Sequence, residues 1–249
     1  MSILSVSKYR KEHVVKTYEA DVHGVLRVVS LMNVLQDIAV EHADSLGFGF
    51  KECMKQGIVW VGANYFIDIL RLPKIGEKFT IETWPAEAKL WGAIRDFIIY
   101  GENDDIIVKA SSLWVLVDFV KKRPVLMKKF FPEYKAINDR ILKTDFEKML
   151  FPDTVETTSD YKVRFDDIDV NNHVNNAIYP LWATESVDMT YRNTHQPCEI
   201  EIVYQKEALF GEDISVLTSW HENQSYHIIK SKQSDAELSR CRIKWRKLH

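Results

Sequence analysis

The sequence predicts an α+β protein made of two copies of one unit, each an antiparallel β-sheet wrapped around a long central α-helix. The repeat is visible in the strands. A turn at Gly76 leads into an alternating segment that ends at Trp84, and a turn at Gly211 leads into a similar segment that ends at Trp220. A long segment with helical spacing lies upstream of each, so both halves follow the same order of elements.

Composition and charge exclude several classes of protein. With 249 residues, 46% hydrophobic and 28% charged, the chain can form one large domain or two smaller ones with a packed core. Its net charge of −3 provides no global positive field for nucleic acid. No segment approaches the roughly 20 apolar residues of a membrane span, and the first residues do not resemble a signal peptide. We therefore expect a cytoplasmic protein without a membrane span.

The two helices are predicted from spacing and caps. The first has Ser30 as its N-cap and Gly47 at its end, with apolar positions at Leu31, Val34, Leu35, Ile38 and Leu46. The second begins near Asn175 or Asn176 and carries an apolar face made of Ile178, Leu181, Trp182 and Met189. Glu185 falls on that face, which favours a buried, hydrogen-bonded carboxylate over a catalytic one.

Further strands complete each half. Residues 96–100 and 226–230 are the next strand candidates, each followed by a polar turn, and the last strands carry Trp114 and Trp245. Between the halves the sequence is charged and rich in proline, which predicts a linker with some helix. The predicted domains are an N-terminal repeat at 1–120, the linker at 121–158 and a C-terminal repeat at 159–249.

A dense polar cluster precedes the second helix. Asp169, Asn171 and His173 are two residues apart, so an extended backbone would place their side chains on one face. A carboxylate can orient a histidine, and an amide can hold a water or a carbonyl oxygen. The alternative is a polar loop that only caps the helix. At an offset of about 145 the counterparts in the first half are Gly24, Leu26 and Val28. Because this cluster does not recur, a functional role is favoured.

Residues 167–186, which contain this cluster, resemble the signature of the acyl-acyl-carrier-protein thioesterases of the plant and bacterial type. The resemblance continues through the first half at residues 31–36, 60–61, 73–77, 82–84, 95–96 and 112–115. It covers roughly residues 12–246 in matched order. The resemblance implies a tandem (double) hotdog fold and an enzyme that hydrolyses a fatty acyl thioester.

Carried over by position, the resemblance places the family's catalytic aspartate, asparagine and histidine at Asp169, Asn171 and His173, and its glutamate at Glu207. The family's cysteine falls on Ala208, which has no thiol to act as a nucleophile. We therefore expect attack by water, with Glu207 or His173 as the general base. Asp169 would orient His173 and Asn171 would position the water or the carbonyl. No metal or other cofactor is expected.

The implied substrate is acyl-acyl-carrier-protein, from which free fatty acid is released and chain elongation ended, with the first repeat enclosing the acyl tail. The implied partner is an acidic acyl carrier protein with a phosphopantetheine-linked acyl chain. Two basic groups are candidates for docking it: Lys121, Lys122, Arg123, Lys128 and Lys129; and Arg240, Arg242, Lys244, Arg246 and Lys247. An acyl-CoA thioesterase of the same fold and a non-catalytic acyl-binding or regulatory protein are the alternatives. The two repeats could suffice as one molecule or form a homodimer.

Overall fold

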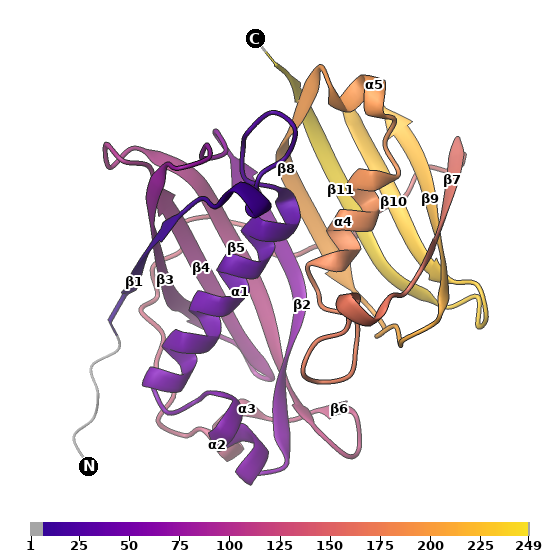
Figure 1. The fold of residues 1–249 in the computed structure, drawn as a ribbon. Coiled ribbons are helices and arrows are strands. Elements are labelled where there is room, and N and C mark those ends of the chain that lie inside the picture. Colours follow the sequence, from indigo (N-terminus) through magenta and orange to yellow (C-terminus); the bar gives the residue numbers. More distant parts are fainter. Residues whose placement is uncertain (1–6, 249) are drawn as a thin grey trace. The chain divides into compact units, whose positions relative to one another are not determined.

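The computed structural model describes residues 7–248, which form two compact units (Figure 1). Unit 1 consists of residues 7–65 and Leu70–Phe146, and unit 2 of Phe66–Ile69 and residues 147–248. Much of the predicted linker, from residue 121 to Phe146, therefore belongs to unit 1. This segment is charged overall, but its apolar side chains, which include Phe131, Ile137 and Ile141, pack against buried clusters of unit 1.

Unit 1 begins with a strand, a 3-10 turn and a long helix, and continues with antiparallel strands. Its elements are β1 (Tyr9–Val14), η1 (Thr17–Glu19), α1 (Val28–Ser45), α2 (Phe50–Lys55), β2 (Ile58–Ile69), β3 (Lys78–Ala88), β4 (Gly92–Tyr100), β5 (Ile106–Asp118), β6 (Arg123–Pro124) and α3 (Met127–Phe130). The strands are hydrogen-bonded in the order β1-β3-β4-β5-β2, and β6 also pairs with β5. In Figure 1, α1 lies diagonally across one face of this sheet.

Helix α1 is held to the sheet by one apolar side. Its buried residues are Val28, Leu31, Met32, Leu35, Ile38, Ala39 and His42. Their spacing of three and four residues is the one that predicted the helix. The predicted N-cap is wrong by one turn, because the helix begins at Val28 and Arg27 occupies the cap position in an extended conformation. Gly47 follows the helix with φ 77°, as its predicted role at the C-terminal end requires.

Unit 2 repeats this order of elements. It contains β7 (Thr157–Lys162), η2 (Phe165–Asp167), α4 (Ile178–Glu185), α5 (Met189–Arg192), β8 (His195–Tyr204), β9 (Asp213–His221), β10 (Gln224–Ser231) and β11 (Glu237–Lys247). Its strands run in the order β7-β9-β10-β11-β8, which matches β1-β3-β4-β5-β2 of unit 1 strand for strand. The predicted α+β repeat, with one sheet around one helix in each half, is confirmed.

The second helix is shorter than predicted. Helix α4 ends at Glu185, and the chain starts a new helix after Asp188, whose carboxylate accepts a hydrogen bond from the Thr190 N–H at 2.7 Å. Glu185 is exposed at this end and pairs with Arg192 at 2.8 Å. The prediction that the Glu185 carboxylate is buried is therefore wrong. Met189, which was predicted to extend the same apolar helix face, lies in the next helix.

In unit 1 a strap, defined as residues 132–146, crosses the sheet and is anchored on the buried Asp96 of β4. The Asp96 carboxylate accepts hydrogen bonds from the Ser111 hydroxyl and the Ile141 N–H, both at 2.6 Å, and lies 3.4 Å from Nε of Arg140. Ile137 and Ile141 pack against the buried cluster of Trp84, Ala86 and Ile98. Burial raises the pKa of Asp96, while its hydrogen bonds act in the opposite direction.

Replacing Asp96 by alanine should destabilise the protein by about 3 kcal/mol, because the Ser111 hydroxyl and the Ile141 N–H lose their acceptor and Arg140 loses a buried ion-pair partner. Asp96→Asn should be milder, since an amide oxygen can still accept. Because burial raises the pKa of Asp96 in the folded state, the unfolded chain loses this proton first, and the free energy of unfolding falls as pH rises above about 4, the ordinary pKa of an aspartate. The stability advantage of wild type over Asp96→Asn should therefore shrink between that pH and the folded-state pKa.

Urea unfolding at several pH values measures both effects. Asp105→Ala is the matched control, because Asp105 lies on the adjoining turn and its carboxylate makes an exposed ion pair with Arg71 at 3.2 Å. That variant should lose no more than about 1 kcal/mol. Equal losses in the two alanine variants would contradict the anchoring role of Asp96.

Candidate functional site

The polar cluster forms a closed turn between η2 and α4 in unit 2. The Asp169 N–H donates to the carbonyl oxygen of His173 at 2.8 Å, and the Asn172 N–H donates to that of Asp169 at 3.1 Å. Asn172 has φ 61°, a left-handed conformation that asparagine tolerates better than most residues. The predicted extended backbone is therefore wrong. The positions of the Asp169, Asn171 and His173 side chains are set by this turn and not by the alternating faces of a strand.

The Asp169 carboxylate is occupied by its own turn. One oxygen accepts from the Asn171 N–H at 2.8 Å, and the other accepts from the Asn171 side-chain amide at 3.3 Å. Asp169 thus sets the orientation of Asn171, whose side chain is exposed. An amide nitrogen has two hydrogens, so Asn171 can donate one to Asp169 and the other to a bound group.

The carboxylate that reaches His173 belongs to Glu207. Nε2 of His173 lies 3.0 Å from Oε2 of Glu207, with the side chains 25% and 48% exposed. The sequence hypothesis gave the orienting role to Asp169, but both oxygens of Asp169 are engaged by Asn171. The four predicted residues therefore meet as two pairs, Asp169 with Asn171 and His173 with Glu207.

A backbone hydrogen bond brings Glu207 to this turn. Strand β8 ends at Tyr204, and the Val174 N–H donates to the carbonyl oxygen of Ala208 at 3.0 Å. Val174 follows His173 and Ala208 follows Glu207, so the bonded residues each adjoin one member of the pair. Gly211, with φ 81°, then turns the chain into β9.

Unit 1 contains the same closed turn, with Asp21 in the place of Asp169. The Asp21 N–H donates to the carbonyl oxygen of Val25 at 2.9 Å, and the Gly24 N–H donates to that of Asp21 at 3.0 Å. The Asp21 carboxylate accepts from the His23 N–H at 2.9 Å. The predicted offset of about 145 is therefore wrong, since the hydrogen bonds align the turns at 148. The turn is part of the repeated frame.

The imidazole–carboxylate pair is specific to unit 2. In the register of the turns, Val25 occupies the position of His173. The Leu26 N–H donates to the carbonyl oxygen of Pro73 at 2.9 Å, as Val174 does to Ala208, so Leu72 occupies the position of Glu207. Two apolar residues in unit 1 thus stand where unit 2 has a base and an acid.

The cysteines are poorly suited to nucleophilic attack, because a thiol must ionise to attack. Burial raises the pKa of Cys53 to about 12 and also raises the pKa of Cys198 and Cys241. All three are free thiols. Ala208, where the resemblance would place a cysteine, is fully buried.

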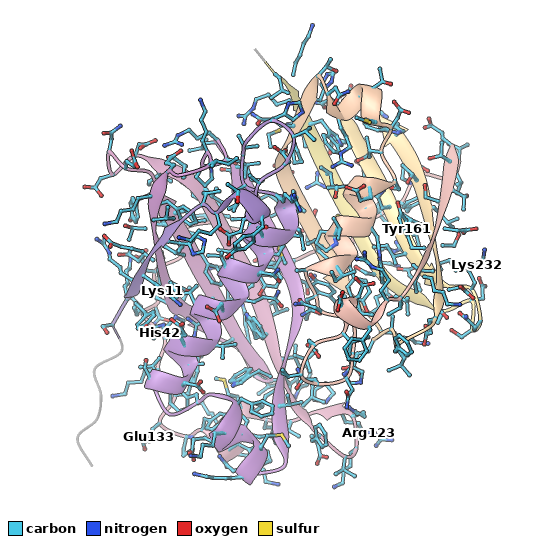
Figure 2. The ribbon with its side chains drawn as sticks, viewed as in Figure 1. Lys11, His42, Arg123, Glu133, Tyr161 and Lys232 are labelled. Atoms are coloured by element: carbon cyan, nitrogen blue, oxygen red, sulfur yellow. The ribbon has the colours of Figure 1, made fainter. Side chains whose placement is uncertain are left out.

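The two basic groups differ in how far they are neutralised. Members of the first group, at residues 121–123 and 128–129, are exposed around the β5–β6 turn and α3, and Figure 2 labels Arg123 there. In the second group, Arg240 forms an ion pair with Glu237. Arg242 forms ion pairs with Glu199 and Glu201, both at 2.9 Å. The first group is the better candidate for an acidic partner.

Sequence reasoning missed one residue at the site. The hydroxyl of Tyr179 accepts a hydrogen bond from the Ala208 N–H at 3.0 Å. Its position in the family-like segment, six residues after His173, was the available signal. In residues 7–248 no group of three or more His, Cys, Asp or Glu side chains is arranged to hold a metal ion. No helix in that range is long and apolar enough to span a membrane.

Comparison with known proteins assigns both halves of the chain. Residues 6–134 match the family model of the acyl-ACP thioesterase N-terminal domain, and residues 151–247 match that of the C-terminal domain. An acyl-[acyl-carrier-protein] hydrolase of Cuphea viscosissima is 24% identical over 96% of this chain and 62% of its own length. The oleoyl-acyl carrier protein thioesterase of Coriandrum sativum is 30% identical over 85% of this chain and 62% of its own length.

Solved structures show the same fold. An acyl-ACP thioesterase from Bacteroides thetaiotaomicron superposes with a TM-score of 0.87 at 22% identity, over 96% of this chain and 98% of that one. The 12:0-ACP thioesterase from Umbellularia californica gives 0.84 at 22% identity, over 97% and 98%. The chain spans less than two thirds of the length of several curated relatives, including the first two. On the two domain matches and this double hotdog fold, the chain belongs to the acyl-ACP thioesterase family.

Proposed function

We propose that this protein hydrolyses the thioester of acyl-acyl-carrier-protein and releases a free fatty acid. The observation that carries the proposal is the His173–Glu207 pair, with 3.0 Å between Nε2 and Oε2, in the half that matches the family's C-terminal domain. The names of the curated relatives, which include acyl-[acyl-carrier-protein] hydrolases, support this substrate class.

The proposed reaction is attack by water on the thioester carbonyl. In this scheme Nε2 of His173, which faces the Glu207 carboxylate, carries the proton, so Nδ1 has the lone pair and accepts the proton of the attacking water. Histidine suits this role because its ordinary pKa lies nearer neutrality than that of a glutamate. The tetrahedral oxyanion then collapses, the carbon–sulfur bond breaks, and the pantetheine sulfur leaves with the proton held by His173.

Asn171 is proposed to stabilise the oxyanion. Its side-chain amide already donates to Asp169 at 3.3 Å, which leaves a second N–H to donate to the carbonyl oxygen. Asp169 acts through Asn171 in this scheme, rather than on His173. Water as the nucleophile is supported by the raised pKa of all three thiols and by Ala208 at the position of the family's cysteine.

We further propose a division of roles between the repeats, with residues 159–249 carrying the catalytic groups and residues 1–120 enclosing the acyl tail. The support is that Val25 and Leu72 of unit 1 replace the histidine and glutamate. A cytoplasmic location is proposed on the three free thiols, which suit a reducing compartment. Homodimer formation stays a prediction from the sequence.

Replacing His173 or Glu207 by glutamine should lower kcat by about 10²–10⁴-fold with little change in KM, because each removes part of one proton-transfer unit. The double variant should be no slower than the slower single variant. Release of free fatty acid from acyl-carrier substrates of several chain lengths is the measurement. The controls are His221→Gln and Glu222→Gln, exposed residues at the other end of β9.

Wild-type rates in both site variants would disprove the assignment of the pair. Matched acyl-CoA substrates belong in the same assay, and faster hydrolysis of those would favour the acyl-CoA thioesterase. Tight binding of an acyl ligand without hydrolysis would establish the non-catalytic acyl-binding protein instead.

The repeated turn gives a test of Asp169. Asp169→Ala and Asp21→Ala should each destabilise the protein by about 1 kcal/mol, because each removes the carboxylate that accepts hydrogen bonds from N–H groups of the turn. Only Asp169→Ala should also lower kcat, since it releases Asn171. Denaturant unfolding and the hydrolysis assay separate the two effects. Unchanged kcat in Asp169→Ala would restrict Asp169 to the structural role of Asp21.

An acidic carrier should dock through the exposed basic group at residues 121–129. Replacing Lys122, Arg123 and Lys128 together by alanine should raise KM for the carrier-bound substrate about tenfold and weaken its dependence on salt. KM for the matched acyl-CoA should change less. A control triple variant at the exposed Lys16, Lys74 and Lys78 should leave both values unchanged. Equal effects of the two triple variants would contradict a docking surface.

A further inference from the structure

Tyr179 of α4 makes a specific hydrogen bond beside the proposed catalytic pair. Its hydroxyl oxygen accepts from the Ala208 N–H at 3.0 Å, and its side chain is almost fully buried. Ala208 is itself buried and directly follows Glu207. A buried N–H without an acceptor is costly, so this hydroxyl satisfies a backbone group that the fold removes from water.

The same peptide segment is held from its other side. The Ala208 carbonyl oxygen accepts from the Val174 N–H at 3.0 Å, next to His173. Ala208 is thus fixed at both its N–H and its C=O, by the helix that follows the polar turn and by the turn itself. Both bonds lie one residue from a member of the His173–Glu207 pair.

Comparison of the two units separates these bonds. The hydrogen bond to the carbonyl oxygen is common to both units, since the Leu26 N–H donates to the Pro73 carbonyl oxygen at 2.9 Å. The hydrogen bond from the backbone N–H is absent at this position of unit 1, because Pro73 has no N–H to donate. In the register of the turns, Leu31 takes the place of Tyr179 and has no hydroxyl to accept. The donor and acceptor are therefore both present in unit 2 and both replaced in unit 1.

The tyrosine ring is fixed by its neighbours. It packs edge-on against Trp182 and Tyr204, with ring centroids 5.4 and 5.6 Å away. The Tyr204 hydroxyl in turn donates to the carbonyl oxygen of Asn176 at 2.9 Å. Burial raises the pKa of Tyr179, and the nearby Glu207 and Asp169 act in the same direction, so the phenol stays neutral. A ring held in this way offers its hydroxyl at a fixed place.

We propose that Tyr179 is a positioning residue that holds the Ala208 amide and thereby keeps the Glu207 carboxylate against His173. This inference rests on the proposed function and adds a residue to it. Beside the corresponding turn, unit 1 has Val25 and Leu72 in place of the acid–base pair, and there a proline and a leucine replace the bonded partners. Tyr179 acts through Glu207 and has no proposed contact with the reacting atoms.

The first experiment is Tyr179→Phe, which keeps the ring and removes the acceptor. We expect kcat to fall about tenfold with KM unchanged, because a Glu207 carboxylate that is held less firmly against His173 lowers the rate of proton transfer rather than substrate binding. In the Glu207→Gln background the same change should have little further effect on kcat. Tyr161→Phe is the matched control, since Tyr161 of β7, labelled in Figure 2, stacks on the same Trp182 and also has a phenol hydroxyl.

The second experiment restores the arrangement of unit 1. Ala208→Pro removes the N–H that needs an acceptor, and added to Tyr179→Phe it should recover part of the lost kcat by restraining the same backbone. An equal fold-loss of kcat from Tyr179→Phe in the wild-type and Glu207→Gln backgrounds would show that Tyr179 does not act through Glu207 and contributes only to the stability of the fold. That result would overturn the proposal. Wild-type kcat in Tyr179→Phe would also overturn it.

A readout without turnover separates this proposal from the proposed function. Hydrogen exchange of the Ala208 amide should accelerate in Tyr179→Phe, and the His173 side-chain NMR signals should shift toward those of Glu207→Gln. Both changes, seen in a protein that hydrolyses no acyl thioester, would support the positioning role while the proposed function failed. Unchanged exchange and unchanged His173 signals would overturn the positioning role whatever the activity.

Discussion

One backbone hydrogen bond in each unit joins the turn before the central helix to the segment that leads into the third strand of the repeat. It links Leu26 to Pro73 in unit 1 and Val174 to Ala208 in unit 2. The partners are more than 30 residues apart in sequence. A closed turn on one side and a glycine with positive φ on the other leave the two segments little freedom. Whatever side chains flank this bond must therefore lie close together.

The two units use that constraint differently. Unit 1 places Val25 and Leu72 beside the bond, and unit 2 places His173 and Glu207 there. The frame is the same, including the aspartate that closes the turn, so the two units differ here in the side chains beside the bond. Asp169 by itself therefore does not indicate catalysis, because Asp21 closes the same turn in unit 1, whereas the His173–Glu207 pair has no counterpart beside that turn. The aspartate carboxylate accepts a hydrogen bond from a backbone N–H of the turn in both units.

Other polar residues also prove structural once their partners are known. Asp96 anchors the strap of unit 1, and Arg240 and Arg242 are paired within unit 2. Each had a charge that could indicate a partner or ligand. Their burial or pairing makes them poorer candidates, because an ion pair already formed leaves less charge for an incoming molecule. The exposed lysines near residue 121 keep their charge available.

The sequence by itself determined the repeat, the class of fold and the residues of the candidate site. Hydrophobic periodicity and glycine turns are local properties, so they identified the strands and the two helices, with errors at the start of α1 and at the end of α4. It did not determine which carboxylate meets His173, the register of the two turns, or the role of Tyr179. Those depend on hydrogen bonds between segments distant in sequence, and only the tertiary structure brings such donors and acceptors together.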